Sequence, residues 1–192
     1  MKRVLGGLFG LAALGCLLWG GEVAIDTLAN PWAHSSLGGL TLTGTWVGEF
    51  SNLDGHPQLA LLELRRTMTP AGRYEDEDSR ITGELQVCGS TPASYTLAGD
   101  PQGWSGRTFV ITRIRVQSPP KPLGYYFHNA QGSWEGDRLN LGVKHAYFQE
   151  DGGLFASGSR YPGVNQTLQL ELKRGSRDRF DQACSSTRKA VP

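Results

Sequence analysis

The chain has 192 residues and a formal net charge of +1, from 19 Lys and Arg against 18 Asp and Glu. Nucleic-acid-binding domains normally carry a clear excess of basic side chains, so this balance argues against a nucleic-acid partner. Behind an N-terminal segment, the length allows one compact domain with its own core but not two comfortable ones.

The N-terminal segment carries a targeting pattern. Lys2 and Arg3 precede an uncharged, largely apolar run over residues 4–21, and Glu22 ends it. The length of the run lies between the roughly 7 to 15 residues of a secretory signal core and the ~20 residues of a membrane span, so length alone does not decide between them. Three interpretations stay open: a retained membrane anchor, a lipoprotein signal ending at Cys16, and a cleaved secretory signal.

We favour the retained anchor because the apolar run continues past Cys16 through Trp19 without a break. The one fair cleavage sequence, residues 27–29, lies beyond two acidic residues. With the basic start held inside, the rest of the chain is exported. We therefore expect a single-pass inner-membrane protein whose C-terminal domain lies in the periplasm, with a lipoprotein or a secreted protein as alternatives. Residues 22–38 are expected to form a tether.

Strand patterns begin directly after this tether. In residues 40–50 the even-numbered positions are apolar residues or glycines, and the odd-numbered positions are mostly threonine. This alternation is typical of a strand with one buried face. The same alternation recurs along the chain. It predicts eight strands, at residues 41–50, 58–67, 80–87, 93–98, 106–116, 124–134, 138–148 and 165–173.

Turn signals separate the predicted strands, including residues 54–55, 99–101 and 136–137, which are rich in Gly, Asp and Pro. Sequential strands joined by short turns favour an antiparallel up-and-down meander. Closing the meander into a small barrel removes the exposed strand edges that promote aggregation. We therefore expect an all-β barrel domain over residues 39–175, with a β-sandwich as the alternative.

A glycine-x-tryptophan opens the first predicted strand, as Gly44-Thr45-Trp46. Here the chain resembles the lipocalin and avidin group of calycin-type barrels, which carry this pattern on their first strand. The resemblance is architectural and implies a barrel with Trp46 plugging one end. No ligand-binding residues carry over from it.

Two cysteines follow the N-terminal segment, Cys88 and Cys184. In an exported domain such a pair is most simply one structural disulfide. Residues 176–192 are expected to form a C-terminal tail in which a short helix from Ser176 brings Cys184 to Cys88.

Motifs for chemistry are few. None of the four histidines forms a spaced metal pair, and no nucleophile elbow, phosphate loop or dinucleotide motif occurs, so no metal or cofactor is predicted. His128 and His145 fall nearly opposite each other when counted from the turn at residues 136–137, which allows a shared site. Two solvent-facing strand histidines are the alternative.

Aromatic residues are dense on the sixth and seventh predicted strands and in the loop that follows them. Core packing explains most of these side chains, and a ligand pocket or partner surface explains the rest. The candidate ligand or partner residues are Trp46, Tyr125, Tyr126, His128, His145, Tyr147 and Tyr161.

Together these patterns lead to one functional expectation and two alternatives. The chain is expected to be a membrane-tethered extracytoplasmic barrel that acts without catalysis, binding a protein partner or stabilising an envelope assembly. The first alternative is a lipocalin-like carrier of a small apolar ligand, with an open lumen lined by Gly83, Gly142 and Ala146. The second is an enzyme with a site scattered over several strands, which no motif supports.

Overall fold

The computed structural model of the chain describes residues 24–34, 40–67, 79–89, 92–117, 124–148, 154–155 and 161–190. The expected anchor and the lipidation candidate Cys16 lie outside these residues. Within the described part of the chain, no helix has the length and apolar character needed to cross a membrane.

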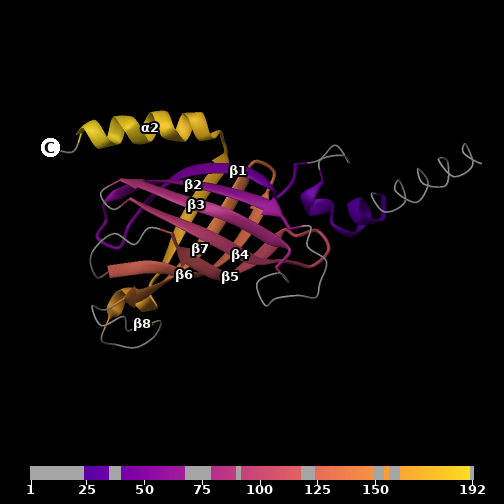
Figure 1. Cartoon of the computed structure of the whole chain (residues 1–192), viewed down its shortest axis with the longest axis horizontal. Coiled ribbons are helices and arrows are strands. Elements are labelled where there is room, and N and C mark those ends of the chain that lie inside the picture. The colour runs from indigo at the N-terminus through magenta and orange to yellow at the C-terminus, as the bar shows by residue number, and fades with distance from the viewer. Residues whose placement is uncertain are drawn as a thin grey trace, which may run out of the picture.

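Eight antiparallel strands close into a barrel (Figure 1). Each strand from β1 to β7 pairs with the next one in sequence, β7 pairs with β9, and β9 returns to pair with β1. This closure confirms the predicted barrel in place of a sandwich. The barrel strands are β1 (Gly44–Ser51), β2 (Pro57–Arg66), β3 (Ile81–Gly89), β4 (Ala93–Gln102), β5 (Thr108–Val116), β6 (Gly124–Glu135), β7 (Arg138–Phe148) and β9 (Thr167–Arg174).

A short additional strand, β8 (Leu154–Phe155), pairs with the end of β7. The predicted turn at residues 99–101 is wrong, because these residues continue β4. The register shifts between Ala98 and Gly99 because Thr112 of β5 is an extra residue there, and β4 stays paired with β5 through Gln102. Gly99 lies so close to the Val110 carbonyl that a Cβ there would overlap it.

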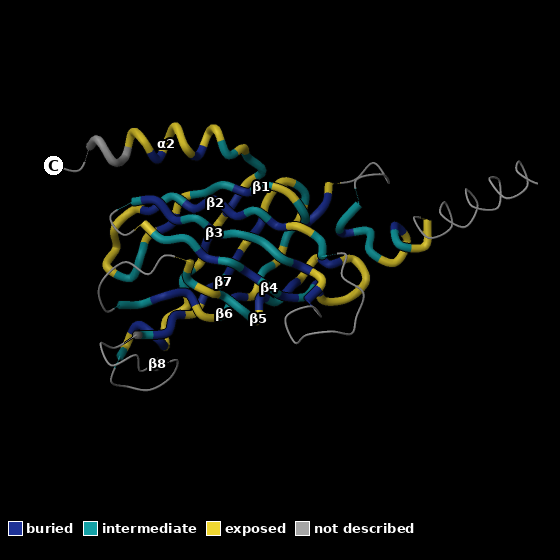
Figure 2. Tube along the Cα trace, viewed as in Figure 1, coloured by how far each residue is buried: buried dark blue, intermediate teal, exposed yellow. Residues whose placement is uncertain are grey.

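Large apolar side chains fill the inside of the barrel. The alternation read from the sequence places every second residue of each strand inward, where the side chains are almost fully buried (Figure 2). Members of this core come from strands all round the barrel and include Trp46, Leu62, Leu85, Ile111, Leu141 and Leu172.

Trp46 is fully buried near the start of β1, at one end of the barrel. Its indole nitrogen donates to the Leu42 carbonyl at 3.0 Å. The Arg174 guanidinium lies 3.8 Å from the centroid of the indole ring, and its Nη1 donates to the Thr43 carbonyl at 2.7 Å. This cation–π contact joins the first and last barrel strands where they meet.

Part of the expected tether packs against the same end. Residues 24–29 are helical, and the 3-10 turn that follows, η1 (Pro31–Ala33), carries Trp32, which is buried as part of the core cluster. The Trp32 carbonyl accepts from the Leu42 amide at 2.8 Å. Asp26 forms an ion pair with Arg66 of β2, and this guanidinium holds the pKa of the carboxyl below its usual value. Residues 24–34 are thus fixed to the barrel.

The C-terminal helix α2 (Arg177–Ala190) runs along the outer wall, and most of it is exposed (Figure 2). It extends beyond the short helix expected from the sequence. Phe180 and Cys184 form its buried contact with Leu61 and Cys88. The predicted Cys88–Cys184 disulfide is present, with Cα atoms 5.8 Å apart, and links α2 to β3.

Replacing Cys184 with serine should lower the free energy of unfolding only under oxidising conditions. The disulfide spans a sequence separation of 96 residues, and closing a loop of this size in the unfolded chain stabilises the fold by up to ~4 to 5 kcal/mol. Urea denaturation with and without reductant measures the effect. Equal losses in both conditions would count against a stabilising disulfide.

Candidate functional site

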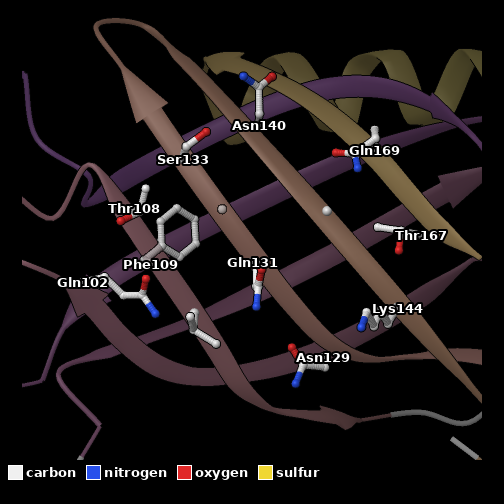
Figure 3. A pocket seen from close by; sticks show the side chains of 13 residues that line it. Gln102, Thr108, Phe109, Asn129, Gln131, Ser133, Asn140, Lys144, Thr167 and Gln169 are labelled. Carbon is white, nitrogen blue, oxygen red and sulfur yellow. The ribbon is translucent and has the colours of Figure 1, made fainter. Parts of the chain in front are cut away.

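A polar groove of about 480 Å³ lies on the outer wall of the barrel, across β5, β6, β7 and β9 (Figure 3). Most of its lining comes from outward-facing positions of these strands, and Phe109 and Gly132 also contribute to it. Amide and hydroxyl side chains dominate the lining, with Asn129, Gln131 and Ser133 from β6, Asn140 from β7, and Thr167 and Gln169 from β9.

Its charge pattern is simple. Lys144 is the one charged side chain among the lining residues, and no carboxylate lines the groove. Each side-chain amide offers both a carbonyl acceptor and an NH₂ donor, so the lining can pair with donors and acceptors alike. Such a surface suits an uncharged or mildly anionic partner rich in hydrogen-bonding groups, such as an extended peptide segment.

Two glycines shape the groove in different ways. Gly142 faces outward, and the atoms nearest to a Cβ there would be side-chain atoms of Gln169 and Thr167, at 3.3 to 3.5 Å. Gly132 instead lies under the ring of Phe109, which a Cβ would overlap. Gly142 leaves room in the groove, whereas Gly132 allows the core to pack.

Sequence reasoning did not select this groove. The sequence does contain a pattern that matches the groove: polar residues alternate at positions 129, 131 and 133 of one strand and at positions 167 and 169 of another. Polar alternation marks any solvated strand face, so it does not distinguish a hollow from a flat wall. The pairing of β7 with both β6 and β9 makes these positions one continuous surface.

Several aromatic candidates from the sequence do come together, near the end of the barrel where β7 finishes. Tyr125 and Tyr147 are cross-strand partners with ring centroids 5.1 Å apart, and Tyr147 stacks on Tyr161 at 4.0 Å. The Tyr125 hydroxyl accepts from the Gly163 amide at 3.2 Å. These rings pack the η3 turn (Pro162–Asn165) onto the barrel. Tyr126, which follows Tyr125 in the sequence, is instead buried in the core.

The two candidate histidines are not brought together. A register shift on β6 pairs Phe127 with His145 and Asn129 with Lys144, which leaves His128 without a place opposite β7. His128 is exposed, whereas His145 is buried between the rings of Phe127 and Tyr125. The expectation that they lie opposite each other is therefore wrong, because the bulge consumes one residue of the count.

His145 is the most perturbed titratable group of this cluster. Burial lowers its pKa to about 4, against a weaker opposing effect from a hydrogen bond with the Gln166 backbone. Its Nδ1 atom is buried without a hydrogen-bond partner. Elsewhere in the described ranges, no three His, Cys, Asp or Glu side chains gather closely enough to hold a metal ion.

The two glycines of the groove should respond oppositely to alanine. Gly132→Ala is expected to lower the free energy of unfolding by ~1 to 3 kcal/mol, because the new methyl group overpacks the buried Phe109 ring. Gly142→Ala should leave it unchanged or raise it by up to ~1 kcal/mol, since a strand glycine loses more chain entropy on folding. Urea denaturation of both variants checks the contrast, and equal effects would contradict this assignment of the two glycines.

Stability should fall between pH 6.5 and pH 4 through His145. An unfolded histidine binds its proton near pH 6.5, while the buried one stays neutral down to about pH 4, so acid favours the unfolded chain in this window. The loss attributable to His145 should be roughly 2 to 3 kcal/mol. Carboxyl groups titrate in an adjoining pH range and also change the stability. The measurement is therefore the difference between the free energies of unfolding of the wild type and of His145→Phe, followed across pH. Parallel profiles would contradict it.

Comparison of the chain with protein-family models, with curated proteins and with solved structures gives no match. What the molecule does is therefore inferred from its own residues and geometry. Two features are the candidates on that basis: the polar groove on the outer wall and the aromatic cluster around the buried His145.

Proposed function

We propose that this protein is a membrane-tethered binding domain of the bacterial periplasm that holds a protein partner in the polar groove without catalysing a reaction. The basic start followed by the apolar run over residues 4–21 supports the tether and the export of the barrel. The disulfide supports an oxidising compartment. The groove itself is the observation that carries the binding role.

The chemistry of the groove favours a protein partner. An extended peptide presents a backbone N–H and C=O at every residue, and side-chain amides such as Gln131, Asn140 and Gln169 can pair with both. A single cation and no carboxylate in the lining make the site tolerant of a neutral or acidic segment. No residue of the groove is assigned a catalytic role.

The carrier alternative has less support. It needs open space inside the barrel, but interior positions carry large buried side chains such as Trp46, Phe50 and Leu62. Gly142, which was expected to line the lumen, faces the outer groove. At Gly83 a Cβ would overlap the Glu63 carbonyl, so this glycine serves the close approach of β2 and β3.

Site-specific photo-cross-linking tests the proposal in cells that express the full chain. A photoreactive amino acid at Gln131 should form one discrete adduct with a partner protein. The same probe at Thr96 of β4, which is not among the residues that line the groove, is the matched control and should give little adduct. The adducts are identified by mass spectrometry.

A groove-filling variant makes the test sharper. Gly142→Val places a branched side chain in the groove, at a position where the atoms nearest to a new Cβ belong to the Gln169 and Thr167 side chains. The adduct from Gln131 should fall at least fivefold, while the thermal unfolding midpoint should not decrease. Equal cross-linking from Gln131 and Thr96, or an adduct unaffected by Gly142→Val, would refute the groove as the binding site.

A further inference from the structure

Exposed large apolar side chains gather at one end of the barrel. Among the described residues these are Ile25, Leu28, Leu40 and Trp104, each 56 to 70% exposed. We call this surface the apolar end. It lies where β4 gives way to β5 and where the chain enters from its N-terminus (Figure 1).

Contacts hold these four side chains in one neighbourhood. The indole nitrogen of Trp104 donates to the Leu28 carbonyl at 2.7 Å. Ile25 lies three residues before Leu28 in the same helical segment, so the two share a helix face. Leu40 and Trp104 line one hollow of about 410 Å³, together with Trp32 and Trp134.

The apolar end is also close to the apolar run along the chain. Consecutive Cα atoms are ~3.8 Å apart, so Gly21 lies within about 11 Å of Ala24 whatever path the chain takes. Residues 24–34 are fixed to the barrel by the Asp26–Arg66 ion pair and by buried Trp32. The barrel therefore has no long free linker between this surface and the end of the apolar run.

We infer that the apolar end rests on the surface of the lipid bilayer, with Trp104, Leu28, Ile25 and Leu40 in the headgroup layer. The inference rests on the proposed tether, because an apolar run held in the bilayer keeps this end within reach of the lipid. Tryptophan suits the membrane–water interface, since its ring is apolar while its N–H needs a partner. In Trp104 that N–H already bonds to Leu28.

This arrangement gives the barrel an orientation. With one end on the membrane, the side wall that carries the polar groove stays open to the periplasm. Contact with the bilayer accounts for the bulky apolar side chains that remain exposed at this end of the described structure, whereas others are packed in the core. A bilayer covers them without a second protein.

Fluorescence quenching by lipid tests this inference with the full chain. The protein is reconstituted in phosphatidylcholine vesicles with or without brominated phosphatidylcholine, which quenches only tryptophans in contact with lipid. The chain has five tryptophans, and two of them, Trp19 and Trp104, would lie in or against the bilayer. Trp104→Phe should therefore remove about half of the quenched emission, and Trp19→Phe should remove the rest.

The two variants separate the inference from the proposal on which it rests. Quenching that depends on Trp19 but is unchanged in Trp104→Phe would overturn the docking and leave the tether standing. No quenching at either tryptophan would overturn both. Emission from Trp104 that is blue-shifted but insensitive to bromine would mean that protein covers the surface, either a second copy or the chain's own apolar run, and would also overturn the docking.

A paired substitution tests the apolar end while Trp104 itself stays unchanged. Ile25 and Leu28 are exposed, so changing both to serine should leave the thermal unfolding midpoint unchanged. The quenching of Trp104 should fall at least twofold in this variant, because apolar contact with the lipid is reduced. Thr96→Ser, on the side wall, is the matched control and should quench as the wild type does. Unchanged quenching in the double variant would refute the role of the apolar end.

Discussion

Closure of the barrel between β1 and β9 is the constraint on which the other features depend. The ladder at this junction is short, with Trp46 opposite Arg174 and Val47 opposite Lys173. The two strands approach so closely that a Cβ at Gly48 would overlap the Glu171 carbonyl. The Arg174 guanidinium over the Trp46 ring adds a side-chain contact where few backbone pairs exist. Without this junction the sheet would expose two strand edges and would leave part of its core uncovered.

Closure also divides the surface into regions of different chemical character. Because alternate residues point inward, most large apolar side chains of the strands lie in the core, and the outward-facing side chains are mostly polar. The helix α2 covers β2 and β3, so it leaves the wall of β5 to β9 open for the groove. The two ends differ as well. One end is covered by Trp32 and carries exposed apolar side chains, while the other is packed by tyrosines around His145.

The predictions from sequence succeeded where local pattern is enough and failed where one residue of register matters. Period-two alternation located all eight barrel strands, and two cysteines outside the N-terminal segment were enough to predict the disulfide. The pairing of His128 with His145 failed because a bulge at residue 128 shifts the register. The predicted turn at residues 99–101 failed because Gly, Asp and Pro are turn residues by local pattern, whereas here they stay paired with β5 beside its extra residue, Thr112.

The sequence by itself determined the strand order, the inward and outward faces, the disulfide and the apolar character of the N-terminal run, because each depends on nearby residues or simple counting. The tertiary structure alone decided which polar positions form a groove and which apolar side chains stay exposed together. Asn129 and Gln169 are forty residues apart in the chain and share a surface only because β7 pairs on both sides. Leu28 and Trp104 meet only because residues 24–34 pack on the end of the barrel that Trp32 covers, a long-range contact that no local pattern encodes.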